Sequence, residues 1–164
     1  MTKLVPLTDV FSIEHGSKMD LNKMERCSPD DTDAVVFVGR SGERNGLSAF
    51  VRRLEDKEPY HAGSISVALG GSALSSFVQP REFYTAQNID VLTPLGDMSM
   101  DVKLYYCLCI EANRFRYTTF GREANRTLKF LSVPAVDQVP GWVEGASARA
   151  IADLCRDLTL LTAK

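Results

Sequence analysis

The chain has 164 residues, of which 45% are hydrophobic and 24% charged, and its formal net charge at pH 7 is −2. This length and composition predict a single soluble globular domain that folds without disulfide or metal support, and they exclude a low-complexity chain. The slight negative charge also argues against a protein that coats nucleic acids indiscriminately, because binding of that kind requires an excess of positive charge.

The N-terminal part contains the most informative segment, a polar loop between two apolar runs. Residues 7–16 are expected to form a strand that ends in a turn, and residues 21–26 a short helix or loop. The apolar runs at 34–38 and 47–53 then flank a glycine-rich stretch, which predicts a hairpin. An Asn-Gly step at 45–46 allows the positive φ angles of a tight reversal.

Polar side chains in this loop make it a candidate for contact with nucleic acid. Arginine suits guanine and phosphate and asparagine suits adenine, so the loop carries donors for both base edges and backbone. These side chains belong to Arg40, Ser41, Arg44 and Asn45. Because Asn-Gly hairpins are also common in folds that bind nothing, a plain surface turn stays open as the alternative.

The middle of the chain adds strands and a helix. Alternating apolar residues predict strands at 64–69 and 89–92, joined by an irregular aromatic connection at 77–84 that a proline interrupts. Apolar residues recur near helical spacing over 98–118, which predicts a long helix, although 105–110 equally suits a buried strand.

The C-terminal part is predicted to contain a closing strand at 126–133 and an amphipathic helix at 147–161. The apolar stripe of this helix consists of Ile151, Leu154, Cys155, Leu158 and Leu161. Such a stripe needs a partner, which is either the helix's own domain or another chain. Together the elements indicate an α+β fold in a single domain, with a twisted mixed or antiparallel sheet, flanking helices and a C-terminal amphipathic helix.

Positive charge is concentrated in two clusters. Between residues 114 and 129, five cations face one acid, a local balance of +4, with three aromatic residues interleaved. The second cluster has five cations and three acids and nets +2; its cations are Arg40, Arg44, Arg52, Arg53 and Lys57. If both clusters lie on one face, the domain presents a positive groove suited to DNA. The alternative is a pair of solvated surfaces.

Neither a metal site nor catalysis is expected. The four cysteines lack C-x-x-C spacing, and Cys107 and Cys109 are predicted to be buried thiols on one side of the chain. An Asn/Asp-Pro-Pro-aromatic motif of adenine methylation is missing from the sequence. The Asp101-Val102-Lys103 run has the letters of a nuclease motif, but so loose a pattern arises by chance. With no apolar run near the ~18 residues that cross a bilayer, we expect a cytoplasmic protein without cofactor.

The order of these segments resembles the target recognition domain of restriction-modification specificity subunits, the S subunits of type I systems and their type IIB and IIG relatives. The resemblance covers residues 5–143. It rests on the opening at 7–16, the 34–51 hairpin, strands beginning at 63 and 83, and the proline-closed segment 128–134 with Pro140-Gly141-Trp142 beyond it.

The resemblance implies a DNA-binding recognition domain at 1–143 followed by a helix at 144–164. It implies a non-catalytic component of restriction-modification and phage defence, which directs a separate methyltransferase or restriction subunit to a short DNA site. Base readout falls to the loop residues Arg40, Ser41, Arg44 and Asn45, and phosphate contacts to Arg114, Arg116, Arg122 and Arg126.

In the specificity-subunit family a long helix after each recognition domain pairs with another and docks the methyltransferase. Here about twenty residues, roughly 30 Å of helix, follow the domain, and the sequence has no second recognition domain. A homodimer through Ile151, Leu154, Leu158 and Leu161 would place two faces on a palindromic interrupted site. The alternatives are a free-standing mimic that binds a host methyltransferase as an anti-restriction decoy, and a small nuclease that uses Asp101.

Overall fold

The computed structural model describes residues 2–117 and 124–162 and shows nine strands and two α-helices in that part of the chain. The strands are β1 Leu4–Pro6, β2 Phe11–His15, β3 Ala34–Val38, β4 Leu47–Arg52, β5 Ile65–Ala68, β6 Ser76–Val78, β7 Phe83–Thr85, β8 Ile89–Pro94 and β9 Ser132–Pro134. The helices are α1 Met100–Glu111 and α2 Ala146–Thr162. Among the described residues, no helix is long and apolar enough to cross a bilayer.

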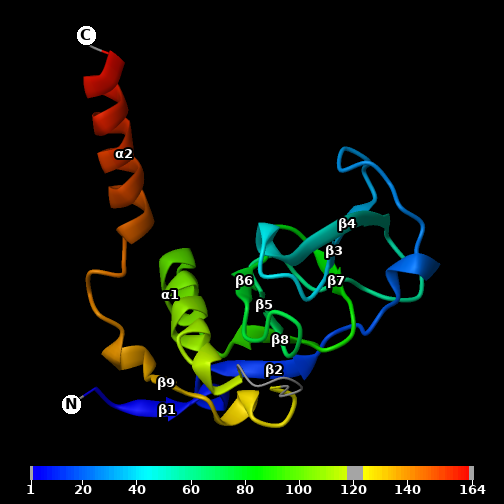
Figure 1. Cartoon of the computed structure of the whole chain (residues 1–164), viewed down its shortest axis with the longest axis horizontal. Helices are drawn as coiled ribbons and strands as arrows, with labels where there is room; N and C mark the ends of the chain where they lie inside the picture. Colours follow the sequence, from blue (N-terminus) through cyan, green and yellow to red (C-terminus); the bar gives the residue numbers. More distant parts are fainter. Residues whose placement is uncertain (1, 118–123, 163–164) are drawn as a thin grey trace.

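The strands form three small sheets rather than one continuous sheet (Figure 1). The largest is fully antiparallel and has the order β2-β8-β5-β6. The second has the order β4-β3-β7, in which β3 pairs antiparallel with β4 and parallel with β7. The third consists of β1, near the N-terminus, paired antiparallel with β9. The α+β fold with mixed and antiparallel pairing is therefore confirmed.

The sequence of β3 explains why this strand lies inside the molecule. All five of its residues are apolar, and the two faces of the strand enter different clusters. Val36 and Val38 pack with Phe83 of β7, whereas Val35 and Phe37 pack with residues that include Tyr84. Because successive side chains of a strand point to opposite faces, a continuous apolar run is what a sheet covered on both sides requires.

The main core lies between the four-stranded sheet and α1. Tyr106 of α1 is fully buried, and its ring meets that of Phe11 edge to face at 5.3 Å between centroids. The Tyr106 hydroxyl donates to the carbonyl of Pro134 in β9 at 2.9 Å, so α1 also holds the two-stranded sheet. Burial raises the pKa of Tyr106 to about 12, which keeps this donor protonated.

The predicted helix at 98–118 exists but is shorter, and the alternative strand at 105–110 is wrong. The helix begins after Ser99, whose hydroxyl caps it by accepting from the Val102 amide at 3.3 Å. It ends at Glu111, and Asn113 satisfies the freed Cys109 carbonyl through its side-chain amide at 2.9 Å. A separate 3₁₀ turn, Arg114–Tyr117, follows.

Two further predictions from the middle of the chain are wrong. The connection at 77–84 contains the end of β6 and the start of β7, strands of three residues that are too short to show alternation. The closing strand at 126–133 consists largely of turns, among them the 3₁₀ turn Leu128–Phe130, and only its end belongs to β9. Leu128 and Leu131 are both buried, and their spacing of three matches a 3₁₀ turn rather than a strand.

The two neighbouring cysteines also differ from their prediction. Both lie on α1, where residues two apart point in different directions. Cys107 is buried, and its burial raises the pKa of its thiol to about 12. Cys109 is only half-buried, so the two thiols do not share one face of a strand.

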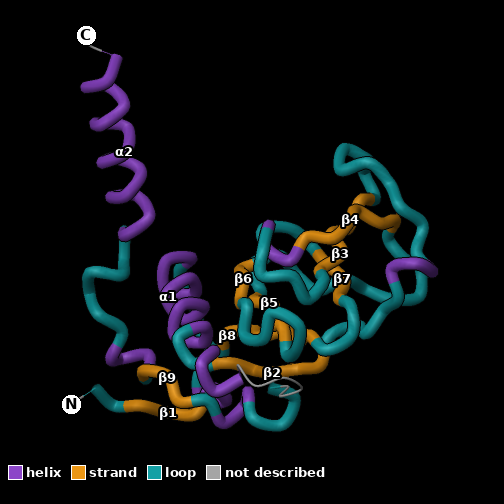
Figure 2. Tube along the Cα trace, viewed as in Figure 1, coloured by secondary structure: helices purple, strands orange, loops and turns teal. Residues whose placement is uncertain are grey.

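The amphipathic helix predicted at 147–161 is confirmed as α2, which projects away from the rest of the molecule (Figures 1 and 2). Its apolar residues Ile151 and Leu154 are 62% and 59% exposed. Polar contacts hold only its base: Ser99 donates to the Glu144 carboxylate at 2.9 Å, and the Ser147 hydroxyl donates to Asp101. The helix is therefore attached firmly at one end while its apolar stripe is left uncovered in the described part.

Candidate nucleic-acid interface

The loop between β3 and β4 has a backbone shape that its own sequence produces. The Gly39 amide donates to the Gly46 carbonyl at 2.7 Å and closes the loop. Arg44, Asn45 and Gly46 follow one another with φ angles of 52°, 55° and 72°. Asparagine and glycine tolerate this left-handed conformation, but arginine rarely adopts it. The predicted turn is thus confirmed, and the strained Arg44 stands at its tip.

Neighbouring segments support this loop through its backbone and leave its cationic side chains exposed. The side-chain amide of Gln79 donates to the Asn45 carbonyl at 2.9 Å, and the Ser72 amide donates to the Arg40 carbonyl at 3.2 Å. The Ser41 hydroxyl accepts from the Glu43 amide at 3.1 Å, which uses part of its capacity inside the loop. The guanidinium groups of Arg40 and Arg44 form no ion pair among the described residues.

Beside the loop, three adjoining hollows run across the surface. The first, of about 270 Å³, is lined by Arg40, Asp20 and Gln87 among others. The second, of about 290 Å³, lies next to it and is lined by residues that include Lys18, Asn88 and Arg126. Lys18 directly precedes Met19 of the first hollow, and Asn88 directly follows Gln87, so the two hollows adjoin.

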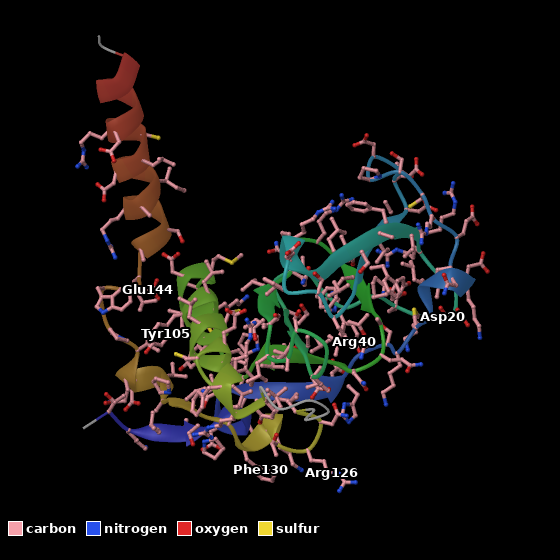
Figure 3. The ribbon with its side chains drawn as sticks, viewed as in Figure 1. Asp20, Arg40, Tyr105, Arg126, Phe130 and Glu144 are labelled. Carbon is pink, nitrogen blue, oxygen red and sulfur yellow. The ribbon has the colours of Figure 1, made fainter. Side chains whose placement is uncertain are left out.

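The third and largest hollow, of about 520 Å³, shares His15, Asn125 and Arg126 with the second and adds Lys129 and Phe130. Figure 3 shows Arg126 and Phe130 near one another at the lower edge of the molecule, with Arg40 above them. We call the three hollows together the basic track and define it by its cations, Arg40, Lys18, Arg126 and Lys129. None of these four cations forms an ion pair in the described part of the chain, although Asp20 lines the first hollow and Asp90 the third.

The predicted group of phosphate-binding arginines is divided by the fold. Arg126 lines the basic track, but Arg114 is engaged elsewhere, donating to the Ala73 carbonyl at 3.0 Å and to the Ser75 hydroxyl at 2.8 Å. Arg114 thereby supports the 69–75 turn that touches the β3–β4 loop. Arg116 lies over the Phe115 ring, with its guanidinium carbon 5.6 Å from the ring centroid. Arg122 lies outside the described residues.

Two arginines of the second predicted cluster are occupied by acids. Arg52 Nε donates to Glu25 at 2.8 Å and its Nη1 to Asp33 at 2.9 Å. Arg53 pairs with Glu58 at 3.2 Å and with Glu82. Hydrogen bonding to Arg52 lowers the pKa of Asp33 below its ordinary value, so this pair is ionised at neutral pH. The cluster therefore does not act as one positive surface.

One pair of residues in the track was not predicted from the sequence. Asp90 of β8 is buried at 4% exposure and accepts from His15 of β2 at 2.6 Å. The available signal was a lone acid inside the apolar run Ile89, Asp90, Val91, Leu92, because a buried acid needs a partner. His15 is exposed, yet it has Asp90 as a partner.

The residues proposed for nuclease chemistry have another role in the fold. Asp101 lies in the first turn of α1 and accepts from Ser147 at the start of α2, and this hydrogen bond lowers the pKa of Asp101. Within residues 2–117 and 124–162, no group of three or more His, Cys, Asp or Glu side chains is placed to hold a metal ion. The geometry of Asp101 is that of a carboxylate joining two helices.

Comparison with known proteins gives a consistent result. Residues 2–134 match the profile of a family described as the type I restriction modification DNA specificity domain. Over 140 residues the chain is 26% identical to the specificity subunit S.BcgI of a type II restriction enzyme from Heyndrickxia coagulans, which covers 83% of this chain and 39% of that protein.

Solved structures resemble the fold over nearly its whole length. The S subunit of a type I restriction-modification system from M. genitalium superposes with a TM-score of 0.61 at 12% identity, covering 97% of this chain and 40% of that one. The HsdS subunit from Thermoanaerobacter tengcongensis gives a TM-score of 0.61 at 12% identity, with 98% and 38% covered. The chain thus spans about two fifths of the length of the relatives it matches.

Proposed function

The chain belongs to the family of type I restriction modification DNA specificity domains, and from that premise we propose that it recognises a short sequence of duplex DNA and directs a separate methyltransferase or restriction subunit to it. The observation that carries the proposal is the β3–β4 loop, whose exposed Arg40 and Arg44 form no ion pair with the residues that the structure describes and whose Arg40 lines the basic track. Catalysis would then reside in the partner, in keeping with the specificity role that the family description names.

Within this proposal the loop supplies base contacts and the track supplies phosphate contacts. Arg40 and Arg44 offer the planar donor pair that suits guanine, and Asn45 suits adenine, with Ser41 as a further donor. Arg126, with the lysines of the track, holds the backbone and sets the register. Arg116 and Arg122 keep their predicted phosphate roles, whereas Arg114 contributes by supporting the 69–75 turn.

The second part of the proposal concerns the helix after the recognition domain, with domain bounds of 1–143 and 144–164. We propose that α2 pairs with another helix through Ile151, Leu154, Leu158 and Leu161, either in a homodimer or in an S-subunit-like assembly with methyltransferase. The exposure of Ile151 and Leu154 supports this role, because water-exposed apolar stripes of this kind are stabilised by a partner. The hydrogen bonds from Ser99 to Glu144 and from Ser147 to Asp101 would hold the helix in a fixed position relative to the domain.

The recognition part is tested by selection from a randomised duplex library with the purified chain at two salt concentrations. We expect one short motif to be enriched at both. Arg44→Ala should then bind the motif and a scrambled duplex with nearly equal affinity, whereas Arg126→Ala should weaken both alike. A library that shows no enrichment, with binding that disappears uniformly as salt rises, would contradict sequence-specific recognition.

The pairing of α2 is tested by light scattering on the same preparation. A dimer mass is expected for the wild type, with a palindromic motif in the selection, and Ile151→Asp with Leu154→Asp should give a monomer. Asp153→Ala with Arg156→Ala is the matched control, because this pair, 2.8 Å apart, lies on the opposite side of α2. A wild-type monomer whose mass increases only when a methyltransferase is added would favour the hetero-assembly over the homodimer.

A further inference from the structure

A buried carboxylate fixes the orientation of an exposed imidazole inside the basic track. His15 and Asp90 face each other in the antiparallel register of β2 and β8, and His15 Nδ1 lies 2.6 Å from Asp90 Oδ1. The side chains are 60% and 5% exposed, respectively. Gly16 follows, and a Cβ there would lie only 2.1 Å from the Thr85 hydroxyl, so the strand end beside His15 is tightly packed. The backbone therefore positions the imidazole as firmly as the carboxylate does.

The hydrogen bond determines what the other ring nitrogen can do. Asp90 accepts at Nδ1, which leaves Nε2 as the atom available to a ligand. In the neutral ring Nε2 is an acceptor, and in the imidazolium it is a donor with a positive charge. Burial raises the pKa of the Asp90 carboxyl, and the hydrogen bond from His15 opposes that rise.

The charged groups around His15 are mostly cations that would suit an anion. Lys18 and Arg126 line the second hollow together with His15, and Lys129 lines the third. The Tyr60 hydroxyl donates to the His15 carbonyl at 3.1 Å. The acids nearby are Asp90 itself and Glu14, which precedes His15 on β2 and therefore points to the other face of the strand. Phe130, 67% exposed, adds an aromatic surface at the far end.

We propose that His15, positioned by Asp90, is a contact for the backbone phosphate of a bound DNA duplex, and that this contact strengthens as pH falls. The choice of DNA as ligand rests on the proposed function, while the phosphate chemistry rests on the pair and its surroundings. Asp90 acts through His15 and is a positioning residue. Since phosphates are the same in every sequence, the contact adds affinity without adding specificity.

The test measures the affinity of the full chain for a random-sequence duplex at pH 8 and pH 6 over a series of salt concentrations. For the wild type we expect affinity to rise roughly three- to tenfold at pH 6, the size of one charge-assisted contact. The slope of log affinity against log salt should steepen by about 0.9, as for one more neutralised phosphate. His15→Gln should lose both changes.

The other histidine of the chain provides the control. His61 is exposed, so His61→Gln should keep the full pH response. Asp90→Asn should reduce the rise in affinity and in salt slope between pH 8 and pH 6, a pH-dependent change that a merely structural role would not produce. The His15 ring signals in a titration of the wild type by NMR give a readout that needs no variant. They should move when the duplex is added and should not respond equally to inorganic phosphate alone.

The outcomes separate this inference from the proposed function. A pH response that survives in His15→Gln overturns the inference even if library selection yields a motif. A response that depends on His15 when no motif is enriched supports the phosphate contact and contradicts sequence-specific recognition. An equal NMR response to inorganic phosphate would overturn the assignment of the site to duplex DNA. Absence of binding to any duplex at low salt would overturn both.

Discussion

Two pairs of arginines contribute equally to the charge of the sequence but have different surroundings in the fold. Arg52 and Arg53 lie at the end of β4, whereas Arg40 and Arg126 lie on loops. The β4 pair contacts five carboxylates, with Arg52 on Glu25, Asp31 and Asp33 and Arg53 on Glu58 and Glu82. The loop pair lines the basic track and forms no ion pair with a carboxylate among the residues that the structure describes. Only the second pair has donors to offer an external anion.

The comparison shows why the sign of a cluster is a weak guide to where a protein binds DNA. An arginine that already has two carboxylates would have to exchange them for phosphate, and the acids left behind would repel the DNA. An arginine without such an ion pair loses only bound water and counterions, and the release of DNA counterions favours binding. The comparison therefore predicts effects that decrease from Arg40 to Arg126 to the β4 pair.

The largest effect is expected for Arg40→Ala. If Arg40 reads a base edge, its loss should lower affinity for the selected motif by about 1–3 kcal/mol, or roughly five- to 150-fold, because a bidentate contact is removed. Affinity for a scrambled duplex should change little. Fluorescence anisotropy with both duplexes checks the prediction. Equal losses on both would move Arg40 from readout to phosphate binding.

A smaller and sequence-independent effect is expected for Arg126→Ala. One lost phosphate contact should weaken the motif and the scrambled duplex by the same factor and should reduce the salt slope by about 0.9. The thermal midpoint should not change, because the Arg126 side chain forms no ion pair in the described part of the chain. A loss confined to the selected motif would contradict the assignment.

These differences also define what the sequence was able to predict. The hairpin of β3 and β4 was predictable because its signals are local: two apolar runs and an Asn-Gly turn. The parallel pairing of Val36 with Phe83 was not, since it joins residues far apart in the chain through a three-residue strand. Helix α2 was predictable for the same local reason, because its apolar stripe repeats at helical spacing.

At the candidate site, the types of residue were predictable and their partners were not. The arginines and the asparagine of the β3–β4 loop follow from its sequence. The pairing of Arg52 with Glu25, or of His15 with Asp90 across 75 positions, depends on strand register. Arg114 resembles Arg126 in sequence context, yet the end of α1 directs it to the Ala73 carbonyl. Charge patterns indicate candidates, and the tertiary structure determines which of them are available.

Arg53→Ala should leave DNA binding within about twofold of the wild type on both duplexes, because an arginine held by two carboxylates is not available to phosphate. This variant is the direct counterpart of Arg126→Ala, as both remove one exposed arginine. The two should be measured side by side in the same anisotropy experiment. A loss for Arg53→Ala as large as that for Arg126→Ala would mean that its ion pairs open on binding, and the comparison would fail.

Arg52→Gln should have the smallest effect on DNA binding. It should also change the stability of the fold in a pH-dependent way. Hydrogen bonding to Arg52 lowers the pKa of Asp33 below its ordinary value of 3.8, so the folded state binds this proton less tightly than the unfolded state does. The stabilisation is therefore complete above the unfolded pKa and is lost as pH falls through the folded one. Wild type and Arg52→Gln should differ in urea midpoint at pH 7 and converge as pH falls below 3.8. High salt should narrow the difference at pH 7, since the pair is exposed. A difference that persists at low pH would assign the role of Arg52 to packing of its aliphatic stem instead of to its charge.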